Sequence, residues 1–252
     1  MDPLVRKGVE QGRDQLNDSR ARLGLPPLPW THGGISRELA IVATFPQLEY
    51  PRARPDPFVR VTGPLMWEQP FGDVELPPGD DPLVLVAPST SQDPDQRMLE
   101  AALSGLDGEP VRVLATYNRR PPPRPLRVPP NARLVEWVSY ARTMPLCSAI
   151  VCHAGHGTLM RALSCGVPVV ACPAAGDMAE NAARVAWAGV GVSLPRRLVT
   201  SRGVQLAVRR VLADERFARR AGELASWAAA NDGASAAADA VEQFAATRAT
   251  AA

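Results

Sequence analysis

The sequence of 252 residues is long enough for one large domain, or for one domain with an appendage. Hydrophobic residues make up 46% of the chain and charged residues 21%, which excludes a chain that stays unfolded. A formal net charge of +2 is too small to indicate a nucleic-acid partner. The N-terminus lacks the apolar core of a signal peptide and no apolar run reaches roughly 18 residues, so we expect no membrane span and a cytoplasmic protein.

The residues before position 64 predict pieces of structure rather than a domain of their own. A charged run from Arg6 to Arg22 favours a helix, which Gly24 and the prolines after it would end. Short apolar runs predict strands at 39–45 and 58–62. Residues 64–82 are rich in proline, as in an extended linker. We therefore predict a domain remnant at 1–63, a linker at 64–82 and a compact domain at 83–246.

From residue 83 onward, short apolar runs alternate with helical patterns. Strands are expected at 83–87, 111–116, 133–137, 149–152, 167–172 and 190–193, and helices at 94–103, 157–165, 177–188 and 201–212. Strands separated by helices pair in parallel through right-handed crossovers. The runs at 83–87 and 167–172 are apolar on both faces, as strands covered on both sides must be. The predicted fold class is therefore α/β, with a doubly wound, Rossmann-like sheet.

The Ala-rich segment 214–244 predicts two helices that close this domain, with a break at Asn231-Asp232-Gly233. Four cysteines, Cys147, Cys152, Cys165 and Cys172, lie without the C-x-x-C pair that is typical of zinc sites. We expect them to be free, buried thiols in a reducing cytosol. Asp93 and Asp95 have the spacing of a carboxylate pair, but they lie where a helix should begin, and we predict no metal there.

The most informative stretch is the one that follows the predicted strand at 149–152. It is a glycine-rich turn leading into a helix, and such a turn presents backbone N–H groups to an anion. Gly155 and Gly157 let the backbone approach a phosphate closely, and His153, His156 and Thr158 add side-chain donors. A nucleotide diphosphate would fit. The pattern is neither G-x-G-x-x-G nor a P-loop, and a tight strand-to-helix turn without a ligand explains the spacing equally well.

A set of motifs covers most of the predicted domain. It consists of Trp137, the run His153-Ala154-Gly155-His156-Gly157-Thr158, Gly166-Val167-Pro168, Asp177, Asn181 and Gly189-x-Gly191. Together these motifs closely resemble the donor-binding half of family 1 glycosyltransferases, the GT-B enzymes that glycosylate macrolides and other natural products. Upstream, Ala43-Thr44-Phe45-Pro46 and Val61-Thr62-Gly63-Pro64 look like the last part of the acceptor-binding domain. The resemblance implies a UDP- or dTDP-linked sugar donor, a small lipophilic hydroxylated acceptor and no metal.

The resemblance also implies a role for each matching position. The donor diphosphate would be bound by His153, Gly155, His156, Gly157 and Thr158, with Ser89 and Thr90 beside it. The nucleobase would stack on Trp137 next to Val138, the ribose would lie near Arg161, and the donor sugar would face Asp177 and Met178.

Two of these positions depart from the family pattern. Arg161 stands where the family has a glutamate that accepts hydrogen bonds from the ribose, and Met178 stands where it has a glutamine beside the sugar. We therefore expect ribose binding and sugar recognition to differ. For two of the positions, the sequence pattern can also be interpreted without a ligand. Asp177, with Glu180 three residues on, has the pattern of a capping box, and Trp137 by itself predicts a core aromatic.

These observations favour a glycosyltransferase of the hexosyltransferase type in which this chain supplies the donor site. No general base is identified, because His32, the only histidine outside the turn, has no match in the family pattern and is expected in a solvated loop. About 80 residues precede the predicted domain, too few for a full acceptor domain, so we expect activity to need another polypeptide. The rival hypothesis is a truncated, non-catalytic nucleotide-binding or interaction module.

A dinucleotide-dependent oxidoreductase is disfavoured, because Pro88-Ser89-Thr90-Ser91 follows the first strand of the domain in place of a glycine-rich fingerprint. The strands at 39–45 and 58–62, if they once lay in a larger sheet, would present unpaired edges and apolar faces. They therefore predict self-association or binding of an acceptor-domain partner.

Overall fold

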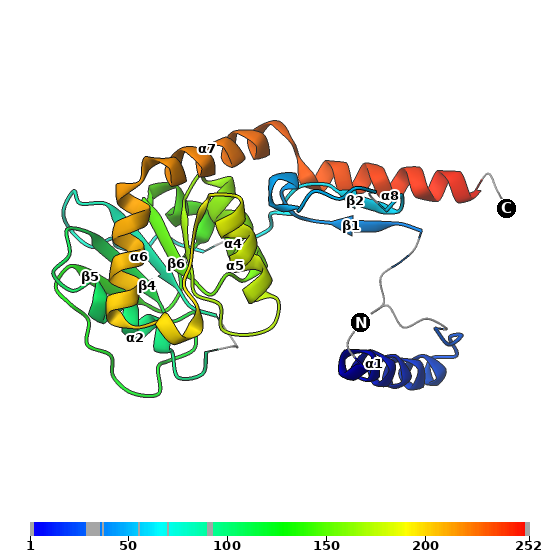
Figure 1. Ribbon diagram of the computed structural model, residues 1–252, viewed down its shortest axis with the longest axis horizontal. Helices are drawn as coiled ribbons and strands as arrows, with labels where there is room; N and C mark the ends of the chain where they lie inside the picture. Colours follow the sequence, from blue (N-terminus) through cyan, green and yellow to red (C-terminus); the bar gives the residue numbers. More distant parts are fainter. Residues whose placement is uncertain are drawn as a thin grey trace.

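The structure is a computed structural model and describes residues 3–28, 36, 38–54, 56–69, 71–89 and 93–249. Two parts are visible in Figure 1. A large α/β body runs from strand β3 to helix α7, and a smaller part contains strands β1 and β2 with helix α8 beside them. His32 and Thr90, two residues singled out in the sequence, lie outside the described residues.

Six parallel strands form the sheet of the body. They are β3 (Leu83–Ala87), β4 (Arg112–Thr116), β5 (Ala132–Val135), β6 (Ala149–Cys152), β7 (Val169–Ala171) and β8 (Gly191–Ser193). Their spatial order is β5-β4-β3-β6-β7-β8, with β3 and β6 as neighbours. This is the 3-2-1-4-5-6 order of doubly wound nucleotide-binding folds. The predicted fold class is confirmed.

Helices cover both faces of this sheet. They are α2 (Arg97–Gly105), α4 (His156–Ser164), α5 (Met178–Trp187), α6 (Ser201–Ala213) and α7 (Glu215–Ala230). Strand β3 shows why both faces must be covered, because all five of its residues are apolar and buried. Leu83 and Leu85 join the core shared with α4, α5 and α7, whereas Val84 and Val86 join the core shared with α2 and α6. The sheet is thus apolar throughout its centre.

Most predicted elements are present, with shifted ends. Helix α2 begins at Arg97 rather than near residue 94, because Gln96 adopts a left-handed conformation (φ 51°) and interrupts the helical path. A short helix α3 (Tyr140–Thr143) and a 3-10 turn (Met144–Leu146) follow β5 and were not predicted. At the C-terminal end, α7 and α8 (Gly233–Ala249) are separated at Asn231, as the sequence predicted.

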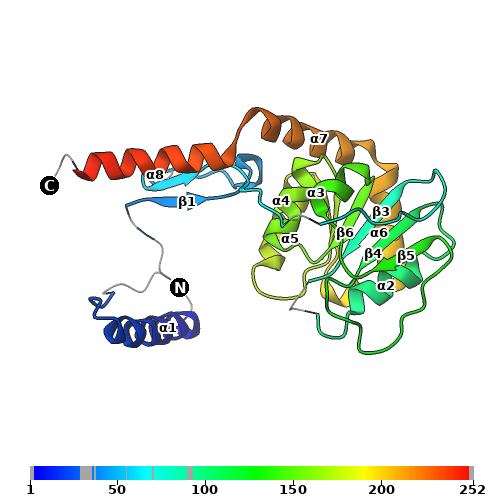
Figure 2. The same ribbon diagram turned by 180° about the vertical axis from the view of Figure 1, so that it is seen from behind.

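The N-terminal region is built less completely. Helix α1 (Pro3–Arg22) lies apart from the body and from β1 and β2 in both views (Figures 1 and 2). Strands β1 (Ala40–Val42) and β2 (Val59–Val61) pair in parallel as a two-stranded sheet. None of their six residues is buried. The predicted strands are therefore present, shorter than expected and half exposed.

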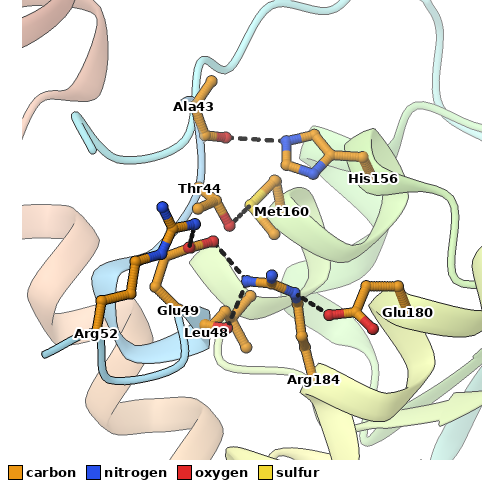
Figure 3. A network of polar contacts seen from close by, with 9 residues as sticks. All are labelled: Ala43, Thr44, Leu48, Glu49, Arg52, His156, Met160, Glu180 and Arg184. Atoms are coloured by element: carbon orange, nitrogen blue, oxygen red, sulfur yellow. Dashed lines mark hydrogen bonds and ion pairs between the residues drawn. The ribbon is translucent and has the colours of Figure 1, made fainter. Parts of the chain in front are cut away.

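Side-chain contacts fasten the segment after β1 to helices α4 and α5 of the body (Figure 3). The Arg184 guanidinium on α5 donates to the Glu49 carboxylate at 2.5 Å and to the Leu48 carbonyl at 3.0 Å. Beside them, the rings of Phe45 and Trp227 pack with their centroids 5.8 Å apart. Trp227 belongs to α7, so this segment is held by three helices of the body.

Residues 64–69 and 71–82 contain no helix or strand and run along the body. The Glu68 carboxylate accepts hydrogen bonds from the backbone N–H groups of Tyr140 and Ala141 at 2.6 and 2.7 Å. Further along, Asp73 pairs with Arg142 at 2.6 Å. The predicted linker is therefore an extended segment that several contacts attach to the domain.

All four cysteines are free. Cys152 and Cys172 are buried as expected, whereas Cys147 and Cys165 are half-buried. Burial raises the pKa of the Cys147 and Cys152 thiols to about 12. None of the helices in the part of the chain that the structure describes is long and apolar enough to cross a membrane.

Candidate functional site

The carboxyl ends of β3 and β6 meet at the centre of the sheet. The chain leaves β3 toward α2, which covers one face, and leaves β6 toward α4, which covers the other. In open α/β sheets, ligands bind in the crevice at such a switch point. The two segments that follow these strands, Pro88-Ser89 and His153–Thr158, are therefore the place to look for a site.

The turn after β6 is shaped by one strained residue. Ala154 is fully buried and adopts a left-handed backbone conformation (φ 60°), which a side-chain-bearing residue adopts only at some cost. The Asn181 amide of α5 donates to the Ala154 carbonyl at 3.0 Å and holds it in place. The backbone then enters α4 at His156, with Gly155 as its N-cap residue. The turn thus aims the N-terminus of α4 toward the switch point.

Gly155 and Gly157 lie at the front of this turn. Gly155 has φ −62° and ψ 137°, and Gly157 is helical, so neither conformation requires glycine. A Cβ atom built at either position would meet no atom of the described residues within 4 Å. Packing against that part of the chain therefore does not require glycine here either. Absence of a side chain leaves the first N–H groups of α4 open to a ligand, and such groups attract anions.

Thr158 lies in the first turn of α4 and is half-buried. Its hydroxyl shares a hydrogen bond with the hydroxyl of Tyr140, which the Asn118 amide also contacts at 3.5 Å. Burial raises the pKa of Tyr140 to about 12, so this phenol stays protonated and can donate. Asn118 donates to the Pro88 carbonyl at 2.5 Å, which links this group to the segment after β3.

The imidazole of His153 is 4% exposed and both of its nitrogens have partners. The Ser89 N–H donates to Nδ1 at 2.8 Å, so Nδ1 carries no proton. Nε2 lies 3.3 Å from an oxygen of Asp93. The two segments at the switch point are therefore joined through this ring, while its predicted contact with a diphosphate stays a prediction.

His156, the other histidine of the turn, is exposed and faces the N-terminal region (Figure 3). Its Nε2 lies 2.9 Å from the carbonyl oxygen of Ala43. Because a carbonyl only accepts, Nε2 carries the proton in this contact. Nothing in this geometry tests the predicted contact of His156 with the diphosphate.

Trp137 is half-buried just after β5, beside the same edge of the sheet. The Arg119 guanidinium stacks on its ring, with Cζ of Arg119 4.6 Å from the ring centroid. The same Cζ lies 5.9 Å from the ring centroid of Phe71. Both Arg119 and Asn118 adopt left-handed conformations (φ 59° and 50°), which bring Arg119 to this place. Val138, the next residue after Trp137, is buried in the core. Base stacking on Trp137 remains a prediction.

Asp177 corrects one expectation. Its side chain does not cap α5, since its own backbone is already helical (φ −72°, ψ −11°) and Glu180 pairs with Arg184 instead. The predicted capping box is therefore wrong. The exposed carboxylate of Asp177 accepts from the Asn181 amide at 3.0 Å. Met178 is 9% exposed and packs in the core, and the sugar-binding role predicted for both residues is not tested.

Arg161 projects from α4 and is half-buried. No ion pair joins it to any residue that the structure describes. Its predicted place near a ribose is not tested. Within the same described ranges, no group of three or more His, Cys, Asp or Glu residues is arranged to hold a metal ion.

Asp93 is the residue of this site that sequence reasoning did not assign. Its carboxylate accepts the N–H groups of Arg97 and Met98, both at 3.2 Å, and so caps α2. Burial raises its pKa, but the hydrogen bonds from His153 and from the Met98 backbone outweigh burial and leave the pKa below its usual value. Sequence reasoning placed Asp93 at a helix start, and no pattern linked it to a histidine 60 residues later.

Comparison with solved structures agrees with this architecture. The calicheamicin glycosyltransferase CalG4 superposes with a TM-score of 0.72 at 24% identity, over 92% of this chain and 58% of that one. The spinosyn rhamnosyltransferase SpnG complexed with thymidine diphosphate has a TM-score of 0.62 at 21% identity, over 92% of this chain and 62% of that one. Over the part of these enzymes that the chain covers, its fold is therefore that of a GT-B glycosyltransferase.

Sequence comparison gives the family. The chain belongs to the family described as erythromycin biosynthesis protein CIII-like, C-terminal domain, which matches residues 97–244. It is 32% identical over 252 residues to 4'-demethylrebeccamycin synthase of Lentzea aerocolonigenes, covering 96% of this chain and 58% of that protein. Aklavinone 7-beta-L-rhodosaminyltransferase of Streptomyces galilaeus is 33% identical over 135 residues, 54% of this chain and 30% of that protein. The chain thus spans little more than half of the first of these relatives.

Proposed function

We propose that this chain supplies the nucleoside-diphosphate-sugar site of a glycosyltransferase that acts on a small hydroxylated acceptor. One observation carries the proposal. Gly155 and Gly157 leave the N-terminus of α4 open at the switch point of a doubly wound sheet, although neither conformation nor packing requires glycine there. A diphosphate is the ligand that fits such a backbone cradle.

In the proposed reaction, an acceptor hydroxyl attacks the anomeric carbon of the sugar while the bond to the diphosphate breaks. Negative charge then grows on the leaving diphosphate. The N–H groups of the first turn of α4, its dipole and the Thr158 hydroxyl stabilise that charge. They act more strongly on the leaving group than on the bound donor, which is what lowers the barrier.

The acceptor hydroxyl must also give up a proton to a base. Near the turn, the imidazoles of both described histidines are engaged, since His153 faces Ser89 and Asp93 and His156 faces Ala43. We propose that the base comes from outside the described residues, either from this polypeptide or from a partner.

The nucleotide is proposed to be UDP or dTDP. The half-buried face of Trp137 offers a stacking surface for a planar base at the same edge of the sheet. A neighbour of the same fold, the spinosyn rhamnosyltransferase SpnG, has been solved as a complex with thymidine diphosphate, which supports this choice. Because Arg119 already stacks on Trp137, a bound base would have to share or displace that guanidinium.

The acceptor side is proposed to involve the small sheet of β1 and β2. None of its six residues is buried, and a parallel pair of strands is rarely stable without further strands or cover. We propose that further acceptor-domain strands, from a partner or a second copy, pack there. Sedimentation velocity over a concentration series tests self-association, and a strictly monomeric profile would leave only the partner.

The donor site is tested by calorimetric titration of the chain with UDP and dTDP, beside two matched glycine variants. Gly157→Ala places a methyl group in the open space before α4, and we expect it to weaken nucleotide binding by about tenfold or more. Gly222→Ala is the control, since Gly222 is also helical with nothing within 4 Å, but lies on α7.

Both variants should raise the free energy of unfolding by about 0.5–1 kcal/mol, because alanine replaces glycine in a helix. A Gly157→Ala variant that is more stable but binds the nucleotide more weakly would therefore support a diphosphate site at the N-terminus of α4. Equal affinities of the wild type and Gly157→Ala would contradict it. No nucleotide binding by the wild type would favour a non-catalytic module in place of the donor site.

A further inference from the structure

The pair of Asp93 and His153 connects two parts of the body that are far apart in the sequence, the connection from β3 to α2 and the turn after β6. His153 follows β6, Ser89 follows β3, and Asp93 caps the first turn of α2. The Ser89 N–H donates to Nδ1 of His153, and Nε2 of the same ring faces the Asp93 carboxylate. The ring therefore lies between the two segments that form the switch point.

The proton positions on this ring follow from its partners. A backbone N–H can only donate, so Nδ1 must be the accepting, unprotonated nitrogen. The ring proton is then on Nε2, where the carboxylate of Asp93 accepts it. The opposite tautomer would lose both contacts, because a proton on Nδ1 would break the bond from Ser89 and an unprotonated Nε2 would face the Asp93 carboxylate with no proton between them.

We propose that Asp93 is a positioning residue of the donor site, which acts through His153 to hold the segment after β3 against the turn after β6. This inference rests on the proposed function. It assigns to Asp93 the task of fixing the His153 tautomer, and to His153 the task of joining the two sides of the crevice. Neither side chain needs to touch the diphosphate.

The surroundings of the pair fit this role. The side chains of Asp93 and His153 are 11% and 4% exposed, so water competes little for their contact. They line a cavity of about 30 Å³ together with Arg97, Arg196 and Cys172. The N-terminus of α2 and the backbone N–H groups of Arg97 and Met98 offset the negative charge of Asp93, which would otherwise oppose an anion nearby.

A helix cap alone explains part of this geometry, but not all of it. Capping requires only that the Asp93 carboxylate accept from Arg97 and Met98. It does not require that a buried histidine lie at 3.3 Å or that the ring accept from Ser89. The two explanations therefore differ in what happens to Ser89 when Asp93 is changed.

The first test is the ¹⁵N spectrum of the histidine rings in the wild type, with His153→Gln used to identify the signals of His153. We expect Nε2 to be protonated and Nδ1 to be unprotonated. The opposite tautomer would overturn the proposal. This measurement needs no nucleotide and no variant of Asp93, so it remains decisive if that variant fails to fold.

The second test compares Asp93→Ala, which removes the acceptor, with Asp95→Ala, which makes the same change two residues away at an exposed position outside the cavity. In Asp93→Ala we expect faster hydrogen exchange at the Ser89 amide and dTDP affinity lower by about tenfold. Asp95→Ala should change neither quantity.

Faster exchange at Arg97 and Met98 with an unchanged Ser89 amide would mean that Asp93 is only a helix cap, and would overturn the proposal. Unchanged dTDP affinity in Asp93→Ala would overturn it as well. If the wild type binds no nucleotide, the proposed function fails, whereas the ring tautomer and the Ser89 exchange still decide whether the pair holds the crevice together.

Discussion

The two sheets of this chain differ in how completely their strands are covered. Every residue of β3 is buried, and helices pack on both faces of the six-stranded sheet. In the two-stranded sheet, no residue of β1 or β2 is buried, although five of the six are apolar. Both sheets are parallel, and parallel strands are normally covered on both faces.

This difference separates a sheet that the chain covers from one that it leaves uncovered. The six-stranded sheet has a core on each face, and the candidate site lies at its switch point. The segment from β1 to β2 is held by contacts to helices that belong to the body, chiefly Arg184 and Trp227. In the same place its buried Phe45 and Leu48 join one of the body's two cores. We infer that the segment orders only on the body.

The largest effect is expected from a change in the covered sheet. Leu85→Ala removes a fully buried side chain from β3 and should lower the free energy of unfolding by about 3 kcal/mol. Ile41→Ala in half-exposed β1 should lower it by no more than about 1 kcal/mol. Urea unfolding curves measure both. Equal losses would mean that the two sheets contribute alike to one cooperative unit.

A smaller effect is expected where the two regions meet. Arg184→Ala removes the hydrogen bonds to Leu48 and Glu49 and should lower the local opening free energy of β1 and β2 by about 1 kcal/mol. Hydrogen exchange should become faster at the amides of β1 but not of β3. The control is Arg209→Ala, which breaks the pair with Glu109 inside the body.

The same change in β1 exchange in both arginine variants would show that the contact in Figure 3 has no special role in docking the segment. Faster exchange in β3 of Arg184→Ala would mean that the covered sheet depends on this segment for its own stability.

The smallest effect concerns acid stability at the start of α7, the helix that contacts the segment through Trp227. Hydrogen bonding from Arg216 lowers the pKa of Asp214 from 3.8 to about 2. Ionised Asp214 therefore stabilises the folded chain above pH 3.8, and this contribution is lost as the pH falls toward 2. The melting temperature of Asp214→Asn should fall less than that of the wild type between pH 4 and pH 2. A parallel fall would contradict the shift.

The sequence predicted the body better than the contacts within its site. Alternating apolar runs and helical patterns are local signals, so the order of strands and helices in the body could be predicted. The ends of elements were harder to predict. Helix α2, for example, begins only at Arg97, because Gln96 has a left-handed backbone conformation. Helix α3 is a single turn, too short for a periodic pattern to form.

The site was predictable where glycines mark it and not where distant residues meet. The open turn at Gly155 and Gly157 could be found from spacing. The contact of His153 with Asp93 joins residues that only the fold brings together, and no local pattern reports it. The capping box at Asp177 failed for a local reason, because the backbone of Asp177 is already helical and Glu180 pairs with Arg184 one turn further on.

The most direct measurement is to titrate ¹⁵N-labelled chain with dTDP and follow the backbone amide signals. If α4 presents the cradle for the diphosphate, the largest and earliest shifts should fall on Gly155, His156, Gly157 and Thr158, and the amides of β1 and β2 should shift little. Shifts confined to other regions, or no shifts at saturating nucleotide, would contradict a donor site at this turn.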